Sequence, residues 1–321
     1  MRLKLVPDET NWDFFAWRKF TFGLSVVAMI VAVLAWVVFG LNFGIDFLGG
    51  TTIRTESAQA VDVGDYRAAI APLGLGDVSI TEVFDPTFAE GRHVGQVRIQ
   101  AQGDAEAVTP ETIAAVEEAL RTVDPTITFP SVESVGPKVS GELVTTAFLA
   151  VGASLVAILF YIWLRFEWQF SVGAVVALFH DVILTIGVFA LLQIRFDLAV
   201  IAALLTIIGY SINDTVVIFD RLRENLIKYK KSPLVDVMNR SVNETLSRTL
   251  MTSGTTLIAL LALLVLGGDV IRGFVFAIFW GVIVGTYSSV YVAKNVVLWL
   301  GVNRDPKKPS DAGTQFADLD A

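Results

Sequence analysis

The sequence contains no cysteine and only two histidines, His93 and His180, among its 321 residues. The absence of cysteine excludes disulfides, thiolate metal sites and a cysteine nucleophile, and two histidines leave little room for a histidine-rich zinc or iron centre. Charged residues are scarce at 17%, whereas ordinary soluble domains carry about 25%. We therefore expect no metal and no cofactor, and any polar chemistry must use carboxylates, arginine and hydroxyls.

Apolar residues, in contrast, make up 54% of the chain. A membrane helix needs about 20 mostly apolar residues, and six windows meet that requirement. They are residues 20–45, 143–164, 168–194, 198–219, 249–268 and 273–293. The first window is longer than the apolar core of a signal peptide, so it is expected to be a retained anchor. The sequence thus predicts a polytopic α-helical membrane protein with six transmembrane helices.

Lysine and arginine are distributed unevenly among the segments that join these windows. With the N-terminus in the cytoplasm, the short outer loops hold only Arg195 and Arg272. Positive residues favour the cytoplasmic side, so both termini of this multi-pass chain are predicted to be cytoplasmic. The predicted segments are tails at 1–19 and 294–321, an external domain at 46–142, spans two to four within 143–219, a basic cytoplasmic segment at 220–247, and spans five and six within 248–293. The basic segment is expected either to lie along the lipid surface as an amphipathic helix or simply to fix the topology.

The predicted external domain is acidic, with 16 acidic and 6 basic residues between positions 42 and 142. Its periodicities indicate strand, helix, strand, strand, helix and strand. These elements fall at residues 51–55, 62–73, 78–83, 94–101, 109–123 and 126–132. Thr109 and Pro110 form a strong helix start, and the element order predicts a ferredoxin-like βαββαβ unit of the α+β class. No nucleophile–base pair is evident and His93 stands alone, so a binding or lever domain is favoured over an enzyme.

A glycine-rich motif lies where the chain leaves the first span, with Gly44, Asp46, Gly49 and Gly50 as its main residues. The glycines permit positive φ angles and close approach of the backbone, and Asp46 can bind freed amides. A structural role is favoured over direct contact with a substrate.

Asp214 lies within the fourth span, where an ionisable side chain costs at least about 2.5 kcal/mol and marks a functional site by default. It is 16 residues from the outer end of the window, or roughly 24 Å, which places it in the cytoplasmic half. Ser211 precedes it by three residues and is expected on the same face. Ser211 and Asn213 are predicted to support it.

Arg248 begins the fifth span from the cytoplasmic side, at a depth comparable to that of Asp214. Thr252 and Thr255 follow at positions four and seven and are predicted to face the bundle interior. A carboxylate near an arginine and hydroxyls suits a proton site. Burial disfavours the charged form of the carboxylate, whereas a nearby arginine favours it. The alternative is a static buried ion pair that locks two helices together.

Asp181 lies in the middle of the third span, beside His180. Adjacent residues point about 100° apart on a helix, so the two are not expected to face one partner well. Asp181 is predicted to be either a second relay residue or a hydrogen-bonding residue between helices, and His180 to be a packing residue. Gly281 and Gly285, four apart in the sixth span, predict close helix packing.

Four segments together resemble the SecF family of the bacterial SecD–SecF protein-export complex, in the RND superfamily. They are the exit motif at 44–50, the Phe179-His180-Asp181 segment, the run at 209–225, and the run at 248–256. The similarity covers nearly the whole chain. It implies half of an RND-type bundle that pairs with SecD, works beside the SecYEG channel after the SecA motor, and uses the proton-motive force to assist late translocation of an unfolded preprotein. In such proteins the residues matching Asp214 and Arg248 belong to the proton path.

The expected mechanism is that protonation of Asp214 loosens its pairing with Arg248, shifts two spans and moves the external domain. No enzymatic activity and no nucleic-acid partner are expected. Three alternatives remain: an intramembrane aspartyl protease using Asp181 and Asp214, an RND-like exporter of small molecules or lipids, and a scaffold subunit without a proton role. The protease is disfavoured because neither aspartate has a Gly-x-Gly-Asp context.

Overall fold

The computed structural model describes residues 10–60, 62–76, 78–83, 91–100 and 108–302. Six helices in this part of the chain are long and apolar enough to cross a membrane, which confirms the predicted number. They are α1 (Arg18–Phe39), α5 (Pro137–Arg165), α6 (Trp168–Leu192), α7 (Leu198–Lys228), α8 (Leu234–Leu266), and α9 (Asp269–Ser288), which continues through the π-helix η2 (Ser289–Ala293) into α10 (Lys294–Leu300). The chain is therefore a polytopic helical membrane protein.

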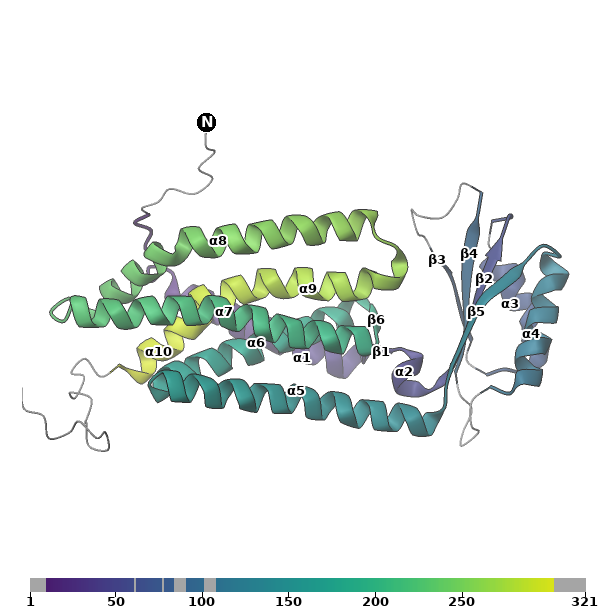
Figure 1. Ribbon diagram of the computed structural model, residues 1–321, viewed down its shortest axis with the longest axis horizontal. Coiled ribbons are helices and arrows are strands. Elements are labelled where there is room, and N and C mark those ends of the chain that lie inside the picture. The colour runs from purple at the N-terminus through teal and green to yellow at the C-terminus, as the bar shows by residue number, and fades with distance from the viewer. Residues whose placement is uncertain (1–9, 61, 77, 84–90, 101–107, 303–321) are drawn as a thin grey trace, which may run out of the picture.

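The molecule is elongated, with the helical bundle at one end and a sheet domain at the other (Figure 1). The start of α1, the end of α10, and the α5–α6 and α7–α8 connections lie at the end of the bundle away from the sheet. The α6–α7 and α8–α9 connections lie at the end near the sheet. Successive helices therefore alternate in direction, as consecutive membrane spans must.

Helices α6, α7 and α9 form the buried centre of the bundle, whereas α5 and α8 are largely exposed. A Cβ atom on Gly281 of α9 would lie 2.3 Å from the side chain of Ile207 on α7. One on Gly285 would lie 3.1 Å from the Ser211 side chain. The close packing predicted for these two glycines is thus confirmed, and it brings α9 directly against α7.

The sheet domain has the element order β2 (Gly50–Ser57), α3 (Val63–Ile70), a 3₁₀ turn η1 (Ala71–Leu73), β3 (Val78–Val83), β4 (His93–Gln100), α4 (Pro110–Val123) and β5 (Thr128–Val135). The strands pair antiparallel in the order β3-β4-β2-β5. Ile53 in the middle of β2 lies opposite Val97 on one side and Val132 on the other. Helices α3 and α4 cover the face of the sheet that points away from the bundle (Figure 1).

The sequence of helix α4 explains both where the helix begins and which face it buries. The Thr109 hydroxyl accepts a hydrogen bond from the Thr112 amide at 3.3 Å, and Pro110 occupies the first turn. Val116 and Leu120, four residues apart, are fully buried against the sheet. Burial of each such side chain contributes about 1.5–3 kcal/mol, which fixes the helix on this face.

The basic segment at 220–247 forms no separate surface helix, which was one of its two predicted alternatives; a role in fixing the topology stays a prediction. Helix α7 runs on to Lys228 and α8 begins at Leu234, so the segment is a helical hairpin continuous with both spans. The charged residues of this hairpin bind one another across the two helices: Arg221 Nε donates to Glu244 Oε2 at 2.7 Å, and Asn225 Nδ2 donates to the same oxygen at 2.7 Å. Mutual satisfaction of these groups explains why the helices continue.

Candidate functional site: two buried carboxylates in a hydroxyl-lined layer

Asp214 lies in α7 with only 3% of its surface exposed. Its Oδ2 accepts one long hydrogen bond, 3.5 Å, from the Ser253 hydroxyl of α8. Ser253 also lies 2.7 Å from the Thr286 hydroxyl of α9. Asp214 therefore faces the seam between α8 and α9 and is held weakly, since hydrogen bonds to a carboxylate are usually about 2.5–2.9 Å long.

The expected pairing of Asp214 with Arg248 is wrong for this conformation. No ion pair within 4.0 Å joins these two described residues, and the Arg248 side chain is exposed. Ser253, which contacts Asp214, follows Arg248 by five residues, or about 7.5 Å along the helix and about 140° around it. Arg248 thus does not contact Asp214 directly in this conformation, although the two charges still interact at longer range.

The predicted support residues are also arranged differently. Ser211 binds Asp181 and not Asp214. Asn213, Thr252 and Thr255 are exposed, and the two threonine hydroxyls donate to carbonyls of their own helix, Thr252 to Thr249 at 3.0 Å and Thr255 to Met251 at 2.8 Å. The face of α8 that points inward carries Thr249 and Ser253 instead, both buried.

Asp181 is the more strongly held carboxylate. It is fully buried, and its Oδ2 accepts hydrogen bonds from Ser211 of α7 at 2.6 Å and from Ser288 of α9 at 2.8 Å. Its Oδ1 lies 2.9 Å from His180 Nδ1. His180 also packs between helices, since its ring stacks on Tyr287 of α9, and its side chain contacts Asp181 directly, which the spacing did not predict.

A short series of hydroxyl groups lies between the two carboxylates. Ser289 Oγ is 2.9 Å from Thr215 Oγ1 and donates to the Ser211 carbonyl at 3.4 Å. Ser288 and Ser289 stand where α9 passes into the π-helix η2, and such widened turns are frequent at functional sites. Both carboxylates thus belong to one polar layer built from α6, α7, α8 and α9.

The exit motif fastens the sheet domain to the start of α7. Strand β1 (Asn42–Phe43) pairs in parallel with β6 (Arg195–Phe196), which precedes α7. The Gly44 amide donates to the Phe196 carbonyl at 2.9 Å, and Asp46 Oδ2 accepts from the amide of Leu198, the first residue of α7, at 3.2 Å. The short helix α2 (Ile45–Leu48) then leads into β2.

Close approach and backbone conformation both require the glycines of this motif. A Cβ on Gly44 would lie 3.1 Å from the Arg195 guanidinium, and Gly49 and Gly50 have φ angles of 73° and 135°. These positions favour the structural interpretation of the motif over contact with a substrate.

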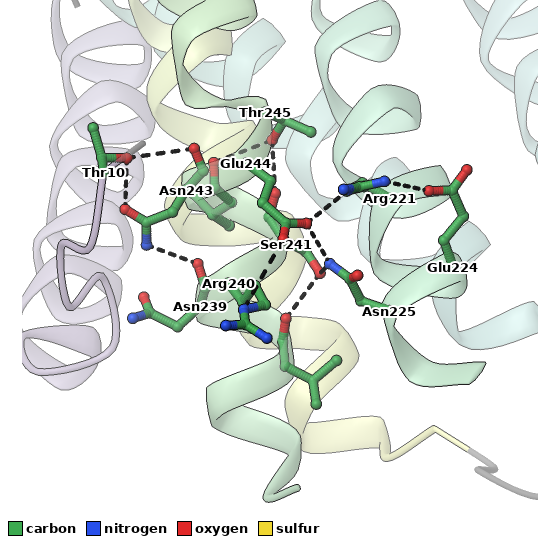
Figure 2. A network of polar contacts seen from close by, with 12 residues as sticks. Thr10, Arg221, Glu224, Asn225, Asn239, Arg240, Ser241, Asn243, Glu244 and Thr245 are labelled. Carbon is green, nitrogen blue, oxygen red and sulfur yellow. Dashed lines mark hydrogen bonds and ion pairs between the residues drawn. The ribbon is translucent and has the colours of Figure 1, made fainter. Parts of the chain in front are cut away.

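A polar network closes the other end of the bundle (Figure 2). The residues 10–17, here called the N-terminal strap, lie against the start of α8. Asn243 accepts hydrogen bonds from the Thr10 hydroxyl at 2.8 Å and the Trp12 amide at 2.9 Å, while Asn239 accepts from the Phe14 amide at 2.9 Å. A polar cavity of about 1010 Å³ lies between Thr10 and Asn11 of the strap and the α7–α8 hairpin, whereas Phe14 and Phe15 of the strap are buried against the bundle.

Lys294 beneath the strap was not singled out from the sequence, which placed it in a cytoplasmic tail. It is 1% exposed, and its Nζ lies 4.1 Å from the centre of the Phe15 ring, with Phe14 and Tyr291 at 5.0 and 5.3 Å. A lone lysine after an apolar run gives no signal that a distant segment will cover it. His93, in contrast, lies on the surface beside Glu82, as predicted.

Six candidate spans, an inserted sheet domain and two buried carboxylates define a multi-pass membrane protein of the transporter type. Residues 115–303 match the family model described as "Protein export membrane protein SecD/SecF, C-terminal", and residues 34–61 match the "SecD/SecF GG Motif". The second match contains Gly49 and Gly50.

Curated relatives carry the name "Protein translocase subunit SecF". The relative from Cereibacter sphaeroides is 69% identical over 100% of this chain and 99% of its own length, and that from Vibrio alginolyticus is 39% identical over 99% and 98%. This chain belongs to the SecF family of protein translocase subunits.

Solved structures of SecDF show the same fold. One, described as a translocon-associated membrane protein from Thermus thermophilus, is 35% identical with a TM-score of 0.81 over 94% of this chain. Another, in a super-membrane-facing form, is 37% identical with a TM-score of 0.68 over 93%. This chain spans only 40% of each of those chains.

Proposed function

We propose that this chain pairs with a SecD subunit and uses the proton-motive force to assist late translocation of an unfolded preprotein across the inner membrane. The preprotein would emerge from the SecYEG channel after the SecA motor has moved it partway. The observation that carries the proposal is the polar layer around Asp181 and Asp214, on the two helices that flank the β6 turn to which the sheet domain is fastened.

The exposed polar residues of α7 and α8 support a partner in the membrane. Asn213, Arg248, Thr252 and Thr255 are exposed in this single chain, within helices otherwise suited to lipid. An arginine at such a position costs at least about 2.5 kcal/mol in lipid unless protein covers it. A second half-bundle with a carboxylate facing Arg248 would remove that cost, and the related SecDF chains are longer than this one.

We propose that the sheet domain is a ferredoxin-like periplasmic domain and that both termini are cytoplasmic. The strand order β3-β4-β2-β5, with two helices on one face, supports the ferredoxin-like assignment. The basic residues Arg18, Lys19, Arg165, Arg221 and Lys228 lie in the helix ends remote from the sheet, which supports the orientation.

The proposed coupling begins with a proton on Asp214. Neutralising this carboxylate removes the cost of a poorly bonded charge at membrane depth, so α7 and α8 can adopt a different packing. Movement of α7 reaches the sheet domain through the Asp46–Leu198 hydrogen bond and the β1–β6 pairing. One proton crossing about 100 mV supplies about 2.3 kcal/mol, enough to bias such a movement but not to unfold a substrate.

We propose a transport role with no enzymatic reaction. An aspartyl protease needs two carboxylates that share a proton, whereas Asp181 and Asp214 bind different partners, with Ser211 bound only to the first. A small-molecule or lipid exporter and a proton-independent scaffold are the remaining alternatives.

Vesicles that contain the chain, its SecD-like partner and the Sec channel test the proposal. Asp214→Asn should abolish the gradient-dependent release of a trapped preprotein while the subunits still co-purify. Unchanged release would favour the scaffold, which would also tolerate the paired replacement of Asp214 and Arg248 by leucine. Gradient-driven efflux of a lipid or dye without effect on preproteins would favour the exporter.

A further inference from the structure

His180 has one satisfied and one unsatisfied ring nitrogen. Its Nδ1 lies 2.9 Å from Asp181 Oδ1, whereas its Nε2 is buried and has no hydrogen-bond partner among the described residues. The residue is fully buried in α6. A buried polar atom without a partner is uncommon in native proteins and is often explained by function.

The partners of Asp181 determine which nitrogen carries the proton. Two serine hydroxyls donate to Oδ2, and the imidazole Nδ1 lies 2.9 Å from Oδ1. With Asp181 ionised, its oxygens can only accept, and Nδ1 is then the donor. In a neutral imidazole the other nitrogen is then an acceptor with a bare lone pair.

We propose that His180 Nε2 is a second proton-accepting atom of this protein, distinct from Asp214, with Asp181 as its counter-charge. A proton delivered by water would form the N–H bond at Nε2 while the Nδ1 proton stays on the imidazole. The His180–Asp181 pair then changes from a net charge of −1 to zero, and loss of the Nε2 proton to water reverses the step. This inference rests on the proposed function, since it adds a site to the proton path.

The His180 imidazole lies beside Asp181 and an aromatic ring of α9, so the His180–Asp181 pair can be treated as one unit. Tyr287 of α9 stacks on it, with ring centres 6.1 Å apart and planes at 25°. The Tyr287 hydroxyl in turn donates to the Thr21 carbonyl of α1 at 2.7 Å and accepts from Ser25 at 3.2 Å. Asp181 and Tyr287 are thus the titratable groups beside His180, and α7 contributes the hydroxyl of Ser211 through Asp181.

The two sites face different neighbours, and this allows them to be loaded separately. His180 faces α1 and α9, whereas Asp214 faces α8 and α9. Ser289, which contacts Thr215 and the Ser211 carbonyl, lies between them. A shift of α7 relative to α9 therefore alters both sites at once.

The chain offers an unusually clean test because it has only two histidines. His93→Gln removes the surface histidine, so nitrogen-15 NMR of the SecD-paired complex reports His180 alone when this chain is labelled and its partner is not. We expect a neutral ring with its proton on Nδ1 at high pH, and a ring protonated on both nitrogens after acidification. The apparent midpoint belongs to the coupled pair, so Asp181→Asn should move it. A ring that keeps one protonation state from pH 5 to 9 would overturn the proposal.

The second test of the proposal measures preprotein export by the complex. His180→Phe keeps a ring to stack on Tyr287 but cannot accept a proton, and we expect at least a tenfold loss of gradient-driven release with assembly intact. If Asp214→Asn abolishes release while His180→Phe is as active as the wild type, this inference falls and the proposed function stands. If neither variant affects release but His180 titrates as expected, the proposed function falls. Where His180→Phe fails to assemble, the NMR titration alone decides.

Discussion

Asp46, in the short helix that leads out of the membrane, accepts a hydrogen bond from the amide of Leu198, the first residue of α7. This bond joins the sheet domain directly to the helix that carries Asp214. The parallel pairing of β1 with β6 lies beside it. The sheet domain is thus fastened to the start of α7 by one bond between the Asp46 side chain and the Leu198 amide, and by the backbone pairing of β1 with β6.

Removal of this attachment should uncouple the domain from the bundle. Asp46→Ala leaves the Leu198 amide without its acceptor, and we expect gradient-driven preprotein release to fall several-fold. Asp46→Asn is the matched control, because its amide oxygen can still accept the bond. Equal activity of the alanine and asparagine variants in the vesicle assay would show that the bond does not transmit movement.

The contact between Gly281 and Ile207 should tolerate no added methyl group. Gly281→Ala places a carbon 2.3 Å from the Ile207 side chain, and overpacking of this kind costs about 1–3 kcal/mol. We expect a lower midpoint of thermal unfolding for the purified protein, with recovery when Ile207→Ala is added. Gly209→Ala is the control, since no atom lies within 4 Å of its added Cβ and it gains the same helix propensity; an equal change in both variants would show that packing against Ile207 is not the cause.

The attachment of the N-terminal strap to α8 should depend on Asn243. Asn243→Ala removes the acceptor of the Trp12 amide and the donor to the Trp12 carbonyl, both 2.9 Å away. Lost hydrogen bonds to buried groups cost about 1–3 kcal/mol, so amide hydrogen exchange in residues 10–17 should be at least about fivefold faster. Asn11→Ala, at an exposed position, should leave exchange unchanged. Slow exchange in both variants would show that packing over Lys294 holds the strap.

The local stability of the sheet domain should depend on pH through the carboxyl group of Asp124. Hydrogen bonds from Ser57 and Thr126 lower the pKa of this carboxyl. Its contribution to stability is therefore complete above the ordinary aspartate pKa of about 3.9 and is lost as the pH falls through the lower folded value. Hydrogen exchange near Ser57, corrected for its intrinsic rate, should accelerate on acidification in the wild type. Asp124→Asn should show the faster exchange already at neutral pH.

The sequence predicted the spans, close helix packing at Gly281 and Gly285, and the elements of the sheet domain, because each depends on local patterns. Charge-free windows identify spans by length, and Gly281 and Gly285 identify close approach. The start of α4 follows from Thr109 and Pro110. These features need no knowledge of which helices become neighbours.

The partners inside the layer could not be predicted in the same way. Lipid is as apolar as the bundle interior, so a threonine stripe such as Thr252 and Thr255 does not reveal which face of α8 points inward. Ser211 shares a face with Asp214 by spacing, yet the position of α6 brings it to Asp181. Ser288 and Ser289 point inward through a π-helix that no periodicity indicated.

The central claim is that Asp214 carries a proton whose movement drives release of the preprotein. The most direct measurement follows proton uptake and preprotein release together in vesicles that contain the complex, for the wild type, Asp214→Asn and the exposed neighbour control Asn213→Ala. We predict that the wild type and the control take up protons as the preprotein is released, and that Asp214→Asn loses both while the complex stays assembled. Gradient-dependent release that persists in Asp214→Asn would contradict the account.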